Sequence, residues 1–427
     1  MAGLRSRLTL DLTPLRVSRN FRLLQVGSFL TGMGTQAALV AIPYQVFTIT
    51  HSPALTGLLG AFELLPLIGF SLYGGAIADR MDRRLLLLWS QIALATTSAL
   101  LAVIAFADLR EVWLIFILAG VLAGFGGFEG VARQSIVPNV VGPELLRPAL
   151  AFSFGLTQLT MVIGPALGGL LIATAGLGPT YAADAVSCGA MAIAAGLMTA
   201  QLPPPVTEHV RVWESIKEGL RFVRGEQALL GSFAIDLLAM TFGMPRALFA
   251  ALAISVYHAG AAGTGALYAS VAIGATVAAL TAGWLNHARW LGRIVIGAVI
   301  VWGLAIAAAG LMTSLALACV FLAIAGAADS VSAVSRTTIN QTVTPDAMRG
   351  RMSSVFQMVV RSGPRLGDIE SGAVAGVAQT RYALGPSVRI SVVSGGLFCV
   401  VGVLVIMVAF PALARYGADE PVPAAAA

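Results

Sequence analysis

The sequence is poor in charge: Asp, Glu, Lys and Arg together make up 11% of its 427 residues, whereas 58% are hydrophobic. Soluble domains carry roughly 25% charged residues. So few charges cannot cover the water-exposed surface of a chain this long. Apolar runs of about 20 or more residues recur along the sequence, and each is long enough to cross a bilayer as a helix. The composition therefore predicts an all-α polytopic membrane protein.

Cysteine and histidine are also scarce. The three cysteines lie in apolar segments without C-x-x-C spacing, so we expect neither a disulfide framework nor a metal site. The four histidines are scattered, and the sequence contains no H-E-x-x-H and no G-x-x-x-x-G-K-[ST] motif. These absences argue against an enzyme and against an ATP-driven pump, and nothing in the chain predicts a cofactor.

The net charge of +6 does not indicate nucleic-acid binding, because the basic residues fall in short loops between apolar runs. Few of them, Arg110, Arg381 and Arg389, fall in the loops predicted to be periplasmic. This excess of basic residues in the other loops predicts that both termini lie in the cytoplasm and that the chain lies in the cell (cytoplasmic) membrane. The first apolar segment is too long for a cleavable signal peptide. An odd number of spans would require one weak span, such as 180–200, to be wrong.

Twelve transmembrane helices are predicted. In the first half they lie near residues 21–48, 54–78, 85–107, 112–136, 149–175 and 180–200; in the second half near 227–253, 262–286, 292–312, 315–338, 352–378 and 388–411. This pattern divides the chain into two six-helix bundles, 1–200 and 227–411. Apolar residues at helical spacing predict that the 201–226 linker contains an amphipathic helix on the cytoplasmic membrane surface. Residues 412–427 are expected to form a disordered cytoplasmic tail.

The second half repeats features of the first about 200 residues later. The stretch from Arg133 through 143–147 to 164–169 has a counterpart in Arg336, 345–349 and 363–368. His51 is likewise echoed by His258 in the loop after the first predicted span of each half. A duplicated half within the membrane is typical of transporters, in which two similar bundles rock about a site between them.

The stretch Gly74-Gly75-Ala76-Ile77-Ala78-Asp79-Arg80-Met81-Asp82-Arg83-Arg84 follows the second predicted span. It resembles the G-x-x-x-D-R-x-x-R-R signature of the major facilitator superfamily, at the place where that family carries it. The resemblance implies a major facilitator fold that works by alternating access. We expect a gating motif in which Gly75 permits close helix packing and Asp79 faces a helix N-terminus. Arg80, Arg83 and Arg84 would bridge carboxylates, or simply orient the turn.

A second motif lies in the fifth predicted span, where Gly164 and Pro165 are followed by Gly168 and Gly169. It resembles the core of the helix 5 motif of major facilitator antiporters, although the upstream glycine spacing differs. Proline bends a helix and glycines let it pack closely. The motif favours export, or else it is a packing kink without directional meaning.

Most of the chain resembles the branch that includes the enterobactin exporters and related macrolide and multidrug effluxers. The segments that carry this resemblance are 41–43, 50–53, the signature loop, 344–346 and 349–352. It implies proton-driven efflux of a siderophore-like or drug-like molecule by a monomer in the lipid bilayer. Many drug antiporters carry an arginine in the middle of the fourth span. Residues 119–124, the middle of that span here, contain none, which argues against proton coupling through such an arginine. An importer, a facilitator, a lipid flippase and a non-transporting membrane sensor remain alternatives.

Ionisable residues inside predicted spans are functional candidates because they are costly in a bilayer. Desolvation favours the neutral form of a carboxyl group, so such a group can exchange a proton. The proton-coupling candidates are Glu63, Glu129, Asp236 and Asp329. The gate or cavity charges are Arg133, Arg336, Arg361 and Asp368. Alternatively, Arg361, Arg365, Asp368 and Glu370 form an ion-paired packing network. Asp184 is expected at the membrane interface. The substrate-cavity candidates are Gln36, Tyr44 and Gln357, or these form ordinary interhelical hydrogen bonds.

Overall fold

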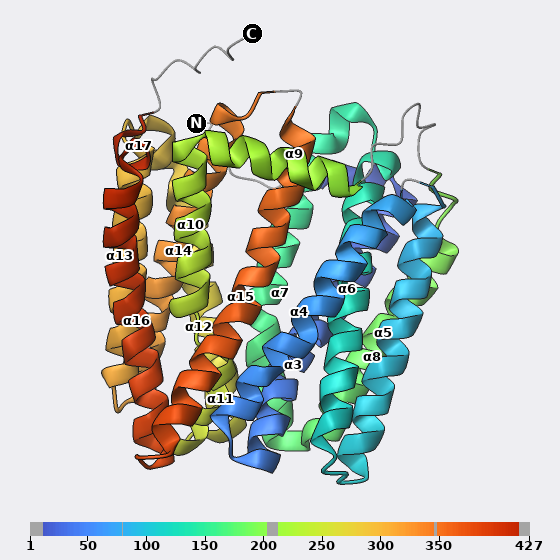
Figure 1. The fold of residues 1–427 in the computed structure, drawn as a ribbon. Helices are drawn as coiled ribbons and strands as arrows, with labels where there is room; N and C mark the ends of the chain where they lie inside the picture. Colours follow the sequence, from blue (N-terminus) through green and yellow to red (C-terminus); the bar gives the residue numbers. More distant parts are fainter. Residues whose placement is uncertain (1–11, 79, 203–211, 346–347, 418–427) are drawn as a thin grey trace, which may run out of the picture. The chain divides into compact units, whose positions relative to one another are not determined.

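The computed structural model describes residues 12–78, 80–202, 212–345 and 348–417, and all regular structure in these ranges is helical (Figure 1). Eleven helices in the described part are long and apolar enough to cross a membrane. The remaining predicted span is α15 (Arg349–Gln379), a helix of 31 residues. It is long enough to cross, but the charges along it, among them Arg361 and Arg365, make it less apolar than the other eleven.

Contacts divide the chain into two compact units: Met1–Gln45 with Leu65–His209, and Val46–Leu64 with Val210–Ala427. The division runs through two helices, α3 (Arg19–Thr50) and α4 (Pro53–Ala78). The bundle boundaries expected from the sequence stay a prediction.

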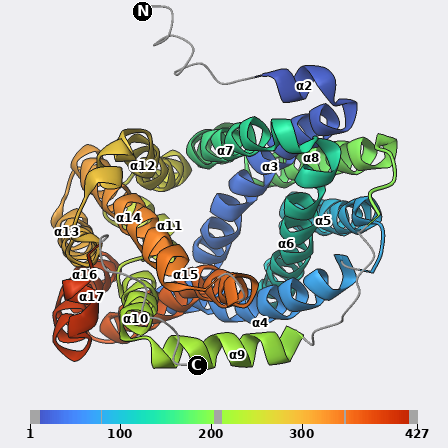
Figure 2. The same cartoon turned by 90° about the horizontal axis from the view of Figure 1, so that it is seen from above.

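The first unit contains most of α3, the second half of α4, and the helices that follow. These are α2 (Thr13–Val17), α5 (Arg83–Phe106), α6 (Val112–Val140), η1 (Pro143–Leu145), α7 (Leu146–Ala175) and α8 (Leu177–Leu197). Helix α5 packs along α8 (Figure 2). The core of the unit is built from large apolar side chains such as Phe21, Leu87, Ile136 and Met191, which come from α3, α5, α6 and α8.

The second unit contains the start of α4 and the rest of the chain. Its elements are α9 (Val212–Gly225), α10 (Gln227–Phe242), η2 (Arg246–Leu248), α11 (Phe249–Ser255), α12 (Gly260–Thr281), η3 (Ala282–His287), α13 (Leu291–Leu311), α14 (Leu315–Val343), α15, α16 (Leu384–Ala409) and α17 (Pro411–Arg415). Helix α14 packs against α12 and α13, and α13 packs against α16 (Figure 2). Trp302 on α13 is fully buried in this unit.

The sequence echo between His51 and His258 is also an echo of backbone shape. Both residues follow a helix and adopt a left-handed conformation, with φ of 49° and 52°. Non-glycine residues rarely do so, and histidine is among the types that tolerate it. The two halves therefore repeat a turn geometry as well as a sequence pattern.

Helix α9 lies within the segment predicted to be an amphipathic linker. In its described part Val223 is buried, while Leu220 and Arg221 are exposed. The linker residues 203–211 lie outside the described residues. The tail prediction needs a correction at its start, because α17 is a short helix there. Pro411 opens it in the first turn, where a missing N–H costs nothing, and Leu413 is buried.

Candidate functional site

The span predicted at 227–253 is not one continuous helix. Helix α10 ends at Phe242, and helical structure resumes only at Arg246, in η2 and then α11. Gly243 and Pro245 lie in the interruption, and proline has no N–H to donate to a preceding turn. The predicted span is present as Gln227–Ser255, but the interruption within it was not predicted, because hydrophobicity continues across the break although the helix does not.

Neighbouring helices bond the polar backbone groups at this break. The Trp302 indole Nε1 donates to the carbonyl oxygen of Gly243 at 2.9 Å. The Tyr268 hydroxyl donates to the carbonyl oxygen of Arg246 at 3.0 Å. Irregular backbone is tolerated at membrane depth only where such partners replace the lost helical bonds. These hydrogen bonds therefore stabilise the interrupted helix within the second unit.

A cluster of four charged side chains adjoins the break. Asp368 on α15 accepts the backbone N–H of Ala247 at 3.0 Å and pairs with the Arg246 guanidinium at 3.4 Å. One turn earlier, Arg365 Nε lies 3.2 Å from Glu63 Oε2. Two carboxylates and two guanidinium groups balance, and their side chains are mostly buried. This pairing supports the packing-network interpretation of α15.

Close glycine packing brings the first part of α4 against α15 at this cluster. A Cβ on Gly372 would lie 2.6 Å from the Cα of Gly57, and one on Gly376 would lie 2.6 Å from the Cβ of Ala54. Small residues allow helix backbones to approach in a membrane. Glu63 is thereby held within reach of Arg365.

A second cluster, here called the α10–α14 triad, consists of Asp236, Asp329 and Arg336. Arg336 Nη1 donates to Asp236 Oδ1, and its Nη2 lies 3.9 Å from Asp329 Oδ1. The side chains of Arg336 and Asp236 are 3% and 2% exposed, whereas that of Asp329 is 23% exposed. Arg336 is thus buried inside the second unit and binds two of the predicted proton-coupling carboxylates.

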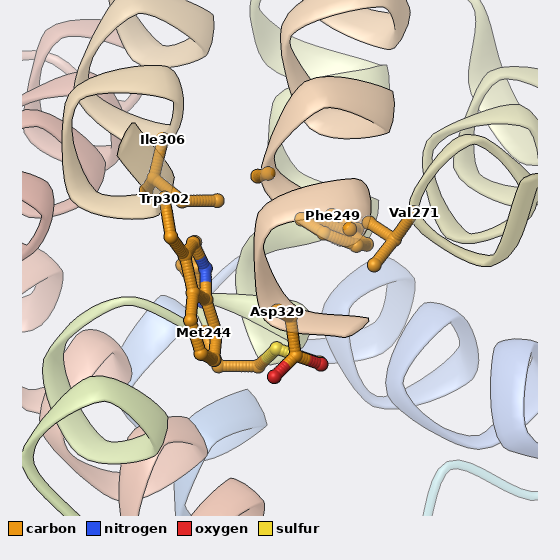
Figure 3. Close-up of a pocket in the computed structure, with 9 residues that line it drawn as sticks. Met244, Phe249, Val271, Trp302, Ile306 and Asp329 are labelled. Carbon is orange, nitrogen blue, oxygen red and sulfur yellow. The ribbon is translucent and has the colours of Figure 1, made fainter. Parts of the chain in front are cut away.

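Asp329 also lines a pocket beside the helix break (Figure 3). The other lining residues are Met244, Pro245, Phe249, Val271, Trp302, Ile306, Ala325 and Gly326. Figure 3 shows the Asp329 carboxylate on the Met244 side of this pocket. The volume of the pocket is about 10 Å³, room for about one water molecule and far too little for a drug-sized ligand.

In the first unit, Glu129 and Arg133 pair as their spacing of four residues on α6 suggests. Their Nε–Oε1 distance is 3.2 Å, and the Arg133 side chain is 32% exposed. Arg133 and Arg336 occupy equivalent places in the sequence repeat but differ in burial. The proton-coupling role of Glu129 and the gate role of Arg133 stay predictions.

Asp184 is predicted at the membrane interface, and its depth in the bilayer stays a prediction. The residue is 2% exposed and lies inside the first unit. Its carboxylate accepts hydrogen bonds from the Ser98 hydroxyl at 2.6 Å and the Cys188 thiol at 3.7 Å. Ser98 and Asp184 are polar residues within apolar spans, which could have indicated a buried contact. Their spacing in the sequence does not show that they contact each other.

The signature turn between α4 and α5 is tied to its own unit. Arg83 Nη1 donates to the carbonyl oxygen of Ser135 at 2.9 Å, and Arg84 Nη1 donates to that of Met198 at 2.6 Å. Arg80 is exposed. These contacts hold the turn against the ends of α6 and α8. Asp79 lies outside the described residues, and of Gly75 only its place in α4 is described, so the gate stays a prediction.

Helix α7 runs unbroken through Pro165, and its glycines contact α3. A Cβ on Gly164 would lie 2.5 Å from the Cβ of Gln36, and one on Gly168 would lie 2.6 Å from the Cα of Ala37. Gly169 is buried on the same helix. These contacts agree with the expectation that the glycines of the motif permit close packing. That the motif favours export stays a prediction.

The remaining candidates stay predictions too. Gln36 and Tyr44 are half-buried on α3, and Arg361 is half-buried on α15. The side chain of Gln357 lies outside the described part. Within the described residues, no three His, Cys, Asp or Glu side chains gather as metal ligands.

Comparisons with known proteins agree with this architecture. Residues 9–416 match the family described as transmembrane secretion effector, a major facilitator family. The enterobactin exporter EntS of Citrobacter koseri is 30% identical over 417 residues, which is 97% of each chain. EntS of Shigella boydii is 30% identical over 402 residues, or 93% of this chain and 94% of that protein.

Solved structures show the same fold. The nucleoside transporter NupG (D323A mutant) superposes with a TM-score of 0.74 at 15% identity, covering 92% of this chain and all of NupG. A bacterial homologue of the iron transporter ferroportin in the inward-facing state gives 0.66 at 17% identity, covering 93% and 99%. The helical fold, the membrane-spanning helices and the match over nearly the whole length agree: this chain is a multi-pass membrane transporter that belongs to the major facilitator superfamily, in its transmembrane secretion effector family.

Proposed function

We propose that this transporter is a secondary-active exporter that moves a siderophore-like or drug-like small molecule out of the cytoplasm by alternating access. The observation that carries the proposal is the similarity, over 97% of the chain, to proteins named as enterobactin exporters. The Gly164-Pro165 segment of α7, which resembles the antiporter motif, supports the same direction.

The proton gradient is the driving force that the chain's chemistry favours. Five acidic side chains of the described spans, Glu63, Glu129, Asp236, Asp329 and Asp368, lie mostly buried beside arginines. Buried carboxyl groups whose partners can change are suited to binding and releasing protons as the protein changes state.

The distribution of arginines supports a location in the cytoplasmic membrane with both termini inside. The family resemblance favours a monomer surrounded by lipid. The substrate and the proton are then its only required partners.

The test is transport by purified protein in liposomes that contain a pH dye. Enterobactin, other catecholate siderophores and cationic drugs would be added under an imposed proton gradient, with protein-free liposomes as the control. We expect one compound class to cause proton flux and to accumulate against its gradient. Substrate movement without proton flux would indicate a facilitator, and no movement of any compound would contradict the exporter proposal.

A further inference from the structure

The two charged clusters described in the second unit differ in their balance of charge. Glu63 and Asp368 are matched by Arg365 and Arg246. The α10–α14 triad has two carboxylates but only the one guanidinium of Arg336. An unmatched charge in a low-dielectric site is costly, and a carboxyl group commonly removes the cost by taking up a proton. The triad can therefore hold one more proton than its ion pairs require.

The geometry distinguishes the two carboxylates of the triad. Arg336 donates a direct hydrogen bond to Asp236, and both side chains are almost fully buried. Asp329 lies 3.9 Å from the same guanidinium, beyond hydrogen-bonding distance, and its Oδ1 has no hydrogen-bond partner in the described structure. Asp236 Oδ2 also lacks a hydrogen-bond partner, but Asp236 has the direct hydrogen bond to Arg336, whereas Asp329 is left with the weaker contact.

Asp329 is also the member of the triad that lines the pocket. The helices around it contribute Phe249 from α11, Val271 from α12 and Trp302 from α13, none of which carries a formal charge. The charged groups that act on Asp329 are Arg336 on its own helix and Asp236 on α10. A pocket of this size and apolarity does not suit a siderophore, whereas a water molecule is small enough for it, and 23% of the Asp329 side chain is exposed.

The pocket lies where the helix of α10 is interrupted, since Met244 and Pro245 form part of its wall. Broken helices at membrane depth mark ion and substrate sites in several transporter folds. A change in the charge of Asp329 would act directly on this wall. The site therefore places the Asp329 carboxyl group next to the interruption of the helix.

Asp184 is the competing buried carboxyl group, in the first unit. Its oxygens accept hydrogen bonds from Ser98 and Cys188, and it lines no described pocket. These bonds fix the Asp184 carboxylate in place within the first unit. Asp184 is therefore the matched control for Asp329.

From the charge balance, the geometry of Arg336 and the pocket at the helix break, we propose that Asp329 takes up and releases the transported proton while Asp236 keeps its ion pair with Arg336. This inference rests on the proposed proton-driven function.

The experiment compares wild type with Asp329→Asn, Asp329→Glu and Asp184→Asn in the same liposomes. Two quantities are measured: substrate-induced proton flux, and exchange of labelled for unlabelled substrate without a gradient. We expect Asp329→Asn to lose proton flux to the level of protein-free liposomes yet keep exchange. Asp329→Glu should retain flux with a shifted pH profile, and Asp184→Asn should behave as wild type.

Proton flux that persists in Asp329→Asn would overturn this inference and leave the exporter intact. A wild type that moves substrate without protons would instead remove the proton coupling on which both proposals depend. If Asp329→Asn does not fold, infrared difference spectra after a pH jump supply the second measurement. The band of the protonated carboxyl group should then shift in Asp329→Glu, and an unchanged band would contradict the assignment.

Discussion

Arg336 and Arg133 show how two residues at equivalent places in a repeat come to have different surroundings. Arg133 pairs with Glu129 on the same helix and keeps a third of its side chain exposed. Arg336 reaches a carboxylate 100 residues away on α10 and is 3% exposed. The first pair follows from helical spacing and could be predicted. The second depends on how α10 packs against α14, which no local pattern contains.

Replacing Arg336 with alanine should strongly destabilise the protein. It would leave Asp236 buried without a cation, and breaking a buried ion pair in this way costs about 3–5 kcal/mol. The measurement is thermal unfolding of the purified protein in detergent. Arg133→Ala is the matched control, with a smaller loss expected because its pair is more exposed. Equal losses in the two variants would contradict the argument from burial.

At the scale of helices, the sequence predicted most of the long elements but not the interruption after α10. The pattern of long apolar runs locates spans because every backbone group in a bilayer must be bonded, and helices achieve this locally. The interruption depends on partners from elsewhere, notably Trp302 on α13. Gly243 and Pro245 were visible signals, but α7 shows that Pro165 can sit inside an unbroken helix.

The contact between α7 and α3 gives a test at the same scale. Gly168→Ala would place a Cβ 2.6 Å from the Cα of Ala37, and overpacking of this kind costs about 1–3 kcal/mol. Gly155→Ala on the same helix is the control, because nothing lies within 4 Å of its added Cβ. We expect a lower unfolding temperature for Gly168→Ala alone. A similar change in unfolding temperature in both variants would indicate that the change comes from the helix propensity of alanine rather than from packing.

For the whole molecule, the proposed orientation makes opposite predictions for two exposed positions. Asp108 lies between α5 and α6, in a predicted periplasmic loop, and Lys217 lies on α9 in the predicted cytoplasmic linker. In a background with Cys319 replaced by serine, Asp108→Cys should react with a membrane-impermeant maleimide in intact cells. Lys217→Cys should react only after permeabilisation. The reverse result would invert the topology and, with it, the direction assigned to transport.

The charged character of α15 has a consequence for how the chain is made. On an insertion scale, an arginine or aspartate at the centre of a span costs about 2.5–3.5 kcal/mol, so α15 is a poor substrate for the translocon by itself. Its partners Glu63 and Arg246 are synthesised earlier than Arg365 and Asp368, with which they pair. Helices that are already in the membrane thus provide charged partners for α15. We therefore expect α15 to insert after these helices and to pair with them as it inserts.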